Sequence, residues 1–221
     1  MSAAQAAVNT KVHLFSGFLG TGKTTAIKSL LAQKPEHEKW VIIVNEFGEI
    51  GIDGAVLTED NIPVAEISGG CLCCVAGPQM TVTVTKMLRE NRPDRLIIEA
   101  SGLAHAASVI DELNTPPLSN ALTVGAVLTV VDPRQFVDPD FNLQGLYQDQ
   151  IGVCDVLVAS KVDLCSDEVM TQFRERAAKL FPTKDLVAEV NNAQVDLAWL
   201  DTPVIQKPRY RLHTLPDNTM G

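Results

Sequence analysis

One short glycine-rich segment constrains the fold of this chain more than any other feature of its sequence. Residues 17–24 read GFLGTGKT and fit the pattern G-x-x-x-x-G-K-[ST], with an apolar run before them and a helical pattern after them. A strand, a glycine-rich turn and a helix in this order form a loop whose backbone amides can surround a phosphate group. The segment therefore predicts a phosphate-binding loop, and the two flanking patterns argue against an accidental match.

The positions of this loop have separate expected roles. Its glycines let the backbone wrap closely around phosphate oxygens, and the amides at the helix start supply oriented donors. Lys23 is expected to reach the terminal phosphates and to act in catalysis, while Thr24 is expected to ligate Mg²⁺. The nucleotide-binding residues predicted from this segment are Gly17, Gly20, Thr21, Gly22, Lys23, Thr24 and Thr25.

Short apolar runs and helical segments alternate along the chain, and this alternation indicates an α/β fold. The runs, rich in Val, Ile and Leu, cover residues 12–15, 41–44, 95–98, 126–131 and 156–159. Helical periodicity is found at 24–33, 81–90 and 169–180, the last with Ser166 as its expected N-cap. The pattern predicts right-handed βαβ units and a mostly parallel sheet flanked by helices, which is the three-layer architecture of P-loop NTPases.

A carboxylate follows the third apolar run, at the edge of the sheet where open α/β proteins bind ligands. Residues 99–102 read EASG. Glu99 is expected to act in catalysis by holding the Mg²⁺ shell, directly or through water, or by orienting the attacking water. Gly102 is expected to offer its backbone amide to the γ-phosphate. The alternative is that Glu99 only stabilises a helix N-terminus through the helix dipole.

The segment after the last apolar run indicates which base the site would bind. Residues 160–163 read SKVD, close to the Asn-Lys-x-Asp pattern by which GTPases hold guanine. The Asp163 carboxylate can accept both donors on the guanine edge, and the stem of Lys161 can cover the base. Guanine is therefore favoured over adenine. Ser160 replaces the usual Asn and shortens one hydrogen-bonding group to the base or to the phosphate loop.

The cysteines are clustered, since three of the five fall within four positions in the segment SGGCLCC at 68–74. Thiolates of Cys71, Cys73 and Cys74 can bind Zn²⁺ or Cu(I), and a carboxylate such as Glu46 can complete the site. Glu49 is a second candidate carboxylate, and His105 is a less favoured supplement. Three soft ligands without a second CxxC indicate a labile, transferable site. The alternative is that these cysteines pack as small apolar residues.

Composition and charge argue against several other classes of protein. With 46% hydrophobic and 20% charged residues, the chain has the composition of a folded globular protein. Its net charge of −9 and lack of basic runs argue against nucleic-acid binding, and its apolar runs are too short to span a membrane. Residues 1–10 lack the features of a signal peptide, so we expect a flexible tail and a reducing, cytoplasmic location. The isolated Cys154 and Cys165 are interpreted as packing residues.

Taken together, these motifs resemble the CobW-like GTPases, which are metal-handling relatives of the nickel chaperones UreG and HypB. The matching segments are GFLGTGKTT at 17–25, NEFGE at 45–49, GGCLCC at 69–74, EASGL at 99–103 and SKVD at 160–163. The combination is specific, because a CxCC loop in this position is not general to P-loop proteins. GIDG at 51–54 and GLAH at 102–105 resemble the YeiR-like branch of the family.

The resemblance implies a Mg²⁺-dependent GTPase that binds Zn²⁺, or alternatively Co²⁺ or Ni²⁺, and couples GTP binding and hydrolysis to metal delivery to a client protein. It also implies that residues 45–53 form a switch between the γ-phosphate and the metal. No arginine finger can be assigned, so we expect slow hydrolysis unless metal, dimerisation or a partner completes the site. Residues 11–201 are the expected GTPase domain and 202–221 an edge or linker, with the family's C-terminal domain expected to be absent.

Two other functions are compatible with the same motifs. One is a zinc buffer or sensor with negligible turnover, in which the nucleotide only sets metal affinity. The other is a P-loop kinase with a small-molecule acceptor, against which the SKVD segment argues.

Overall fold

The structure is a computed structural model that describes residues 9–44, 62–67 and 77–203. Its centre is a seven-stranded sheet in the order β3-β2-β4-β1-β5-β6-β7, and every neighbouring pair of strands is parallel. The strands are β1 (Thr10–Ser16), β2 (Trp40–Val44), β3 (Val64–Glu66), β4 (Arg95–Glu99), β5 (Leu122–Val131), β6 (Val156–Ala159) and β7 (Leu186–Glu189). Because all strands run the same way, their carboxyl ends share one edge of the sheet.

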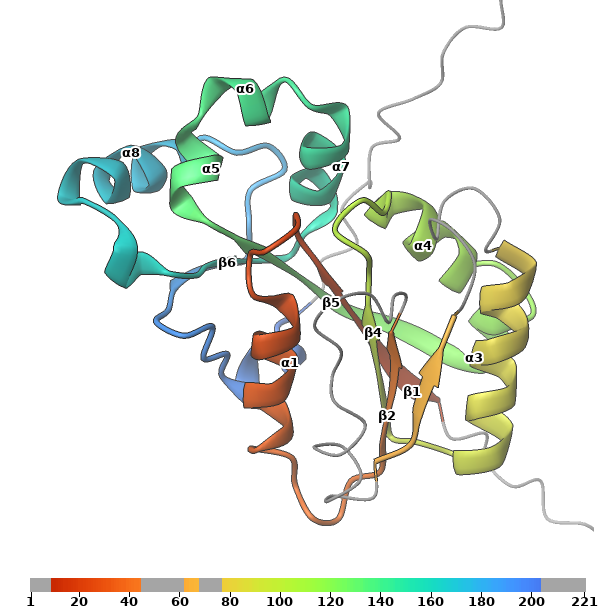
Figure 1. Ribbon diagram of the computed structural model, residues 1–221. Helices are drawn as coiled ribbons and strands as arrows, with labels where there is room; N and C mark the ends of the chain where they lie inside the picture. The colour runs from red at the N-terminus through yellow and green to blue at the C-terminus, as the bar shows by residue number, and fades with distance from the viewer. Residues whose placement is uncertain (1–8, 45–61, 68–76, 204–221) are drawn as a thin grey trace, which may run out of the picture.

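Helices cover both faces of this sheet, as Figure 1 shows with α1 on one side and α3 and α4 on the other. The α-helices are α1 (Lys23–Leu31), α3 (Gly77–Asn91), α4 (Ala106–Leu113), α5 (Pro133–Val137), α6 (Pro139–Asn142), α7 (Gly145–Val153) and α8 (Asp167–Ala177). Three 3₁₀ turns complete the described elements: η1 (Leu118–Asn120), η2 (Val162–Leu164) and η3 (Leu197–Asp201). Among the described residues, no helix is both long and apolar enough to cross a membrane.

Alternate residues of each central strand pack into opposite cores. In β2, Val41 and Ile43 join the cluster under α3 and α4, whereas Ile42 and Val44 join the cluster under α1. All four side chains are buried, and burying a side chain of this size contributes roughly 1.5–3 kcal/mol. This two-sided burial is why the strands read as continuous apolar runs rather than as alternating ones.

A third apolar cluster fills the space beside β6. Phe136 of α5 and Phe173 of α8 meet edge to face with their centroids 5.0 Å apart, and Tyr147 of α7 is buried in the same cluster. The cluster fixes α5, α7 and α8 against the end of the sheet that carries the expected base-recognition segment.

Charged side chains connect Arg95, the first residue of β4, to η3. Arg95 donates hydrogen bonds to both carboxylate oxygens of Asp201, at 3.1 and 2.9 Å, and to Glu38 at 2.9 Å. His13 of β1 is fully buried beside Arg95. Burial and the nearby Arg95 charge lower the pKa of His13 to about 4. His13 therefore has the structural, uncharged role expected from its place within a strand pattern.

The predicted fold class is confirmed, and each predicted strand lies within an observed one. The predicted helices correspond to α1, α3 and α8, with bounds that shift by one to four residues at their ends. Ser166 is the N-cap of α8, since its hydroxyl accepts a hydrogen bond from the Val169 amide at 3.3 Å. The sequence patterns did not predict β3, β7, α4 or the short helices α5 to α7, because elements of three to nine residues give too little periodicity.

Candidate functional site

The phosphate loop connects β1 to α1 with the backbone that its glycines were expected to permit. Gly17, Gly20 and Gly22 have φ angles of 134°, 73° and 98°. At Gly17 the requirement is also steric, because a Cβ atom there would lie 2.1 Å from the Val130 carbonyl oxygen. Gly22 is the left-handed N-cap of α1. The chain can therefore wrap tightly between β5 and the start of α1 only with glycine at these positions.

Lys23 lies inside this loop. Its ammonium group donates to the carbonyl oxygens of Gly17 at 2.9 Å and Phe18 at 3.0 Å, and the residue is only 8% exposed. The hydroxyl of Thr21 also donates to the Phe18 carbonyl, at 2.9 Å. The positive charge is thus placed at the centre of the loop that would surround a phosphate group.

Thr24 and Glu99 face each other across the carboxyl edge of the sheet. The Oγ1 hydroxyl of Thr24 donates to Glu99 Oε1 at 2.6 Å. Burial raises the pKa of Glu99, while the hydrogen bond from Thr24 and the charge of Lys23 oppose that rise. A hydroxyl and a carboxylate are hard oxygen ligands, so the pair fits the donor set that Mg²⁺ requires. Thr25, the next residue of α1, is exposed.

Gly102 packs against the phosphate loop. A Cβ atom on Gly102 would lie 2.7 Å from the backbone nitrogen of Leu19 and 2.6 Å from its Cδ2 atom. Glycine is therefore required by close approach of the two segments. The residues predicted to meet the γ-phosphate and the phosphate loop lie together in the structure.

The segment 160–163 follows β6 and reaches the same edge. Ser160 Oγ donates to the Thr21 carbonyl oxygen at 2.6 Å, and it also lies 3.1 Å from the Val131 carbonyl oxygen. The serine thus contacts the phosphate loop. Lys161 has a left-handed backbone with φ 55°, and Asp163 is exposed within η2.

Asp132 borders the segment 160–163, and the sequence motifs did not predict this contact. It is the N-cap of α5 after β5, accepts from the Arg134 amide at 3.0 Å and lies with its Oδ2 atom 3.8 Å from Lys161 Nζ. Burial alone would raise the pKa of Asp132, but the hydrogen bonds from Arg134 hold it below its usual range. The signal was present in the sequence, since Asp-Pro after an apolar run is a typical N-cap followed by proline at N1.

The predicted zinc ligands, except the less favoured His105 before α4, lie outside the described residues. This holds for Cys71, Cys73, Cys74 and Glu46, and also for Glu49. Within the described ranges, no group of three or more His, Cys, Asp or Glu side chains could hold a metal ion. Cys154 is buried, and burial raises the pKa of its thiol, consistent with a packing role.

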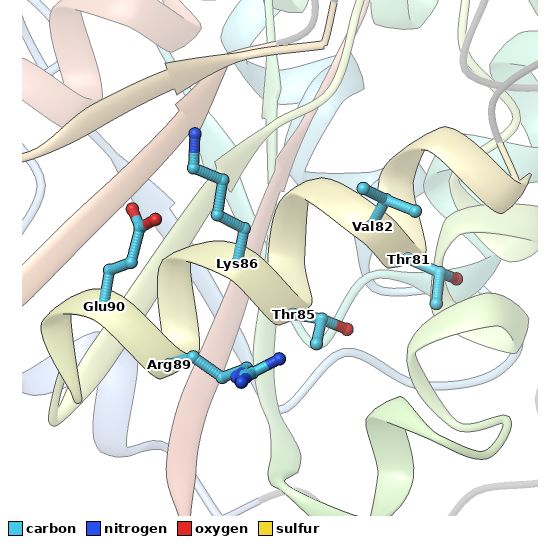
Figure 2. A pocket seen from close by; sticks show the side chains of 6 residues that line it. All are labelled: Thr81, Val82, Thr85, Lys86, Arg89 and Glu90. Carbon is cyan, nitrogen blue, oxygen red and sulfur yellow. The ribbon is translucent and has the colours of Figure 1, made fainter.

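A separate hollow lies over one face of α3, the helix that follows the cysteine segment in the sequence. Figure 2 shows six side chains that line it, and none is a predicted site residue. They are Thr81, Val82, Thr85, Lys86, Arg89 and Glu90.

A strand, a tight glycine loop, a buried lysine and a threonine–carboxylate pair at the carboxyl edge of a parallel sheet define a P-loop nucleotide-binding protein. Comparison with known proteins then gives the family. The chain matches the CobW/HypB/UreG nucleotide-binding domain over residues 11–188 and belongs to that family.

The chain spans only part of the length of two curated relatives that it resembles. It is 43% identical over 159 residues to the zinc chaperone YeiR of Escherichia coli (strain K12), covering 72% of this chain and 48% of YeiR. It is 36% identical over 217 residues to the zinc chaperone CobW of Sinorhizobium sp, covering 85% of this chain and 60% of that protein. The first match supports the YeiR-like branch.

Solved structures agree on the fold. The Zn(II)-bound YjiA GTPase from E. coli gives a TM-score of 0.63 at 23% identity, covering 88% of this chain and 61% of YjiA. HypB from Helicobacter pylori in complex with nickel gives a TM-score of 0.60 at 17% identity, covering 87% of this chain and 83% of HypB. At these identities the likeness extends to the fold alone.

Proposed function

We propose that this chain is a Mg²⁺-dependent GTPase domain that binds Zn²⁺ at its CxCC segment and couples the nucleotide cycle to delivery of that metal to a client protein. The observation that carries the proposal is the Thr24–Glu99 hydrogen bond beside the buried Lys23, within a domain of the CobW family. We further propose residues 11–201 as the GTPase domain, 202–221 as an edge or linker, and the cytoplasm as its location.

The phosphate end of the site supports hydrolysis. Mg²⁺, when bound, would neutralise charge on the β- and γ-phosphates, with Thr24 as a ligand and Glu99 as a ligand or a holder of its water shell. The Lys23 ammonium now bonds two neutral carbonyls, and phosphate oxygens are stronger acceptors for it. Lys23 and the loop amides would then stabilise the transferring phosphoryl group.

The base end supports guanine. Asp163 is exposed, where its carboxylate can accept both guanine donors, and Ser160 holds the phosphate loop through the Thr21 carbonyl. Lys161 lies near the buried Asp132, which limits where the lysine side chain can go and leaves its stem to cover the base.

The zinc site is supported by the sequence and by the printed names of the relatives. Cys71, Cys73 and Cys74, with Glu46 as the candidate fourth ligand, offer the mixed thiolate and carboxylate set that suits Zn²⁺, although Co²⁺ and Ni²⁺ bind similar sets. YeiR and CobW are named zinc chaperones. The client protein and any metal- or nucleotide-dependent dimer belong to the same proposal.

A competitive Zn²⁺ titration of the reduced protein tests it, carried out with GTPγS, with GDP and without nucleotide. The matched variant replaces Cys71, Cys73 and Cys74 with Ala, and a Cys154→Ala variant controls for the loss of a thiol. We expect tight binding that depends on the nucleotide and is lost only in the triple variant. Nucleotide-dependent affinity with negligible GTP turnover would instead favour the buffer or sensor, and equal affinity in all three proteins would overturn the metal site.

A further inference from the structure

A buried glutamine of α7 holds the segment that carries Gly102. Gln150 is 1% exposed, and its Nε2 atom donates to the carbonyl oxygens of Gly102 at 3.1 Å and Ala104 at 3.2 Å. These two carbonyls lie on either side of Leu103, so one side chain restrains both ends of a three-residue segment. Figure 1 shows α7 beside α4, the helix that follows this segment.

The chemistry of the two contacts fixes the orientation of the amide group. Both nearby atoms are carbonyl oxygens, which only accept hydrogen bonds, so the NH₂ end of Gln150 must face them. Within the described residues, its Oε1 atom has no hydrogen-bond partner. The Gln150 side chain therefore donates two hydrogen bonds, and these two contacts satisfy its buried NH₂ group.

The backbone of Gln150 is linked through β5 to β1, the strand that precedes the phosphate loop. Thr129 of β5 donates from its hydroxyl to the Gln150 carbonyl oxygen at 3.1 Å. The Thr129 hydroxyl also lies 2.7 Å from that of Ser16, the last residue of β1. Gly17 follows directly, so Gln150 is fixed relative to the start of the loop.

The same helix also contacts the phosphate loop directly, through an aromatic side chain. Tyr147 packs edge to face on Phe18, with ring centroids 6.4 Å apart, and Phe141 lies 5.5 Å from Phe18. Three residues further along α7, Gln150 holds Gly102. One rigid element thus sets both partners of the close contact between Gly102 and Leu19.

Gly102 needs such a restraint because glycine has little conformational preference of its own. The close approach to Leu19 excludes any larger residue, so order at this position has to come from a neighbour. We propose that Gln150 is a positioning residue that holds 102–104 with the Gly102 amide presented to the γ-phosphate, and thereby sets the preference for GTP over GDP. This inference rests on the proposed GTPase function.

Affinities for GTPγS and GDP, measured by calorimetry with Mg²⁺ present, test this role. Gln150→Met keeps the length of the side chain and removes both donors, while Gln148→Met makes the same change at an exposed position of α7. We expect Gln150→Met to lose roughly tenfold in GTPγS affinity, the loss of about one net hydrogen bond, with GDP affinity within about twofold. Gln148→Met should match the wild type.

A second variant gives a readout that a packing defect would not produce. Gln150→Glu places a carboxylate against two carbonyl oxygens, and lowering the pH protonates that buried group and restores one donor. Its deficit in GTPγS affinity relative to wild type should shrink between about pH 8 and about pH 6. If thermal unfolding shows that Gln150→Met does not fold, the pH dependence of GTPγS affinity in Gln150→Glu tests the positioning role instead.

Two results would overturn the inference in distinguishable ways. If wild-type protein binds GTPγS tightly and Gln150→Met weakens GTPγS and GDP equally, or neither, Gln150 only packs and this inference alone fails. If wild-type protein binds no GTPγS, the proposed function fails together with it.

Discussion

The hydroxyl of Thr24, in the first turn of α1, donates a 2.6 Å hydrogen bond to the carboxylate of Glu99 at the end of β4. The two residues are 75 positions apart, and they meet because β4 pairs with β1 and the Phe15 position of β1 is in register with Glu99. This contact brings the loop threonine to the one carboxylate predicted for the magnesium shell.

Replacing Glu99 should separate stability from activity. Because burial raises the pKa of Glu99, the protonated form of this side chain is favoured in the folded chain. Its contribution to stability is therefore complete at low pH and is lost as pH rises through the folded pKa. At neutral pH without ligands, Glu99→Gln should therefore unfold at an equal or higher temperature than wild type. Its GTP hydrolysis with Mg²⁺ should fall by roughly 10²-fold. Loss of stability together with full activity would contradict this assignment.

Removing the loop lysine should abolish hydrolysis and leave metal binding intact. Lys23→Ala removes the one charged side chain of residues 17–24, whose ammonium lies against the Gly17 and Phe18 carbonyl oxygens, so kcat should drop by roughly 10²–10³-fold. Zn²⁺ affinity without nucleotide should match wild type, and Lys28→Ala, a lysine further along α1, serves as the control. Equal loss of Zn²⁺ binding would show that the two sites are not separable.

Asp163 and Ser160 should affect different aspects of nucleotide binding. Asp163→Ala removes the acceptor for two guanine donors and should weaken GDP roughly 10²-fold while leaving weak ADP binding unchanged. Ser160→Ala instead deprives the buried Thr21 carbonyl of its 2.6 Å donor, so both nucleotides should weaken by a similar factor. Competition of labelled GDP against GDP and ADP measures both effects. Unaltered GDP-to-ADP selectivity in Asp163→Ala would exclude Asp163 as the base reader.

Acid should destabilise the fold through His13. The unfolded chain binds a proton at His13 near pH 6.5, whereas the folded chain does so only near pH 4. Stability contributed by the neutral imidazole is therefore complete above about pH 6.5 and is lost as pH falls towards 4, by up to about 3 kcal/mol. Urea unfolding of wild type and His13→Asn at several pH values measures the difference. Parallel pH curves for the two proteins would show that His13 does not titrate in this way.

The parts of the site that the sequence predicted are those that local chemistry defines. Gly17, Gly22, Lys23 and Thr24 lie within eight consecutive positions, and a glycine-rich turn between a buried strand and a helix has few conformations open to it. Ser166 was equally predictable, because capping needs only the amides of the next turn. The family resemblance depends on the same kind of contiguous segment.

What only the tertiary structure decided is which distant residues meet those segments. Strand order places Glu99 against Thr24, and packing of α7 places Gln150 under Gly102, 48 positions away. Asp132 likewise approaches Lys161 only because β5 pairs with β6. The sequence by itself determined the loop, the alternation of strands and helices and the carboxylate at the end of β4, since these follow from neighbouring residues. The contacts between them depend on strand order and on side-chain packing across the core, which no local pattern specifies.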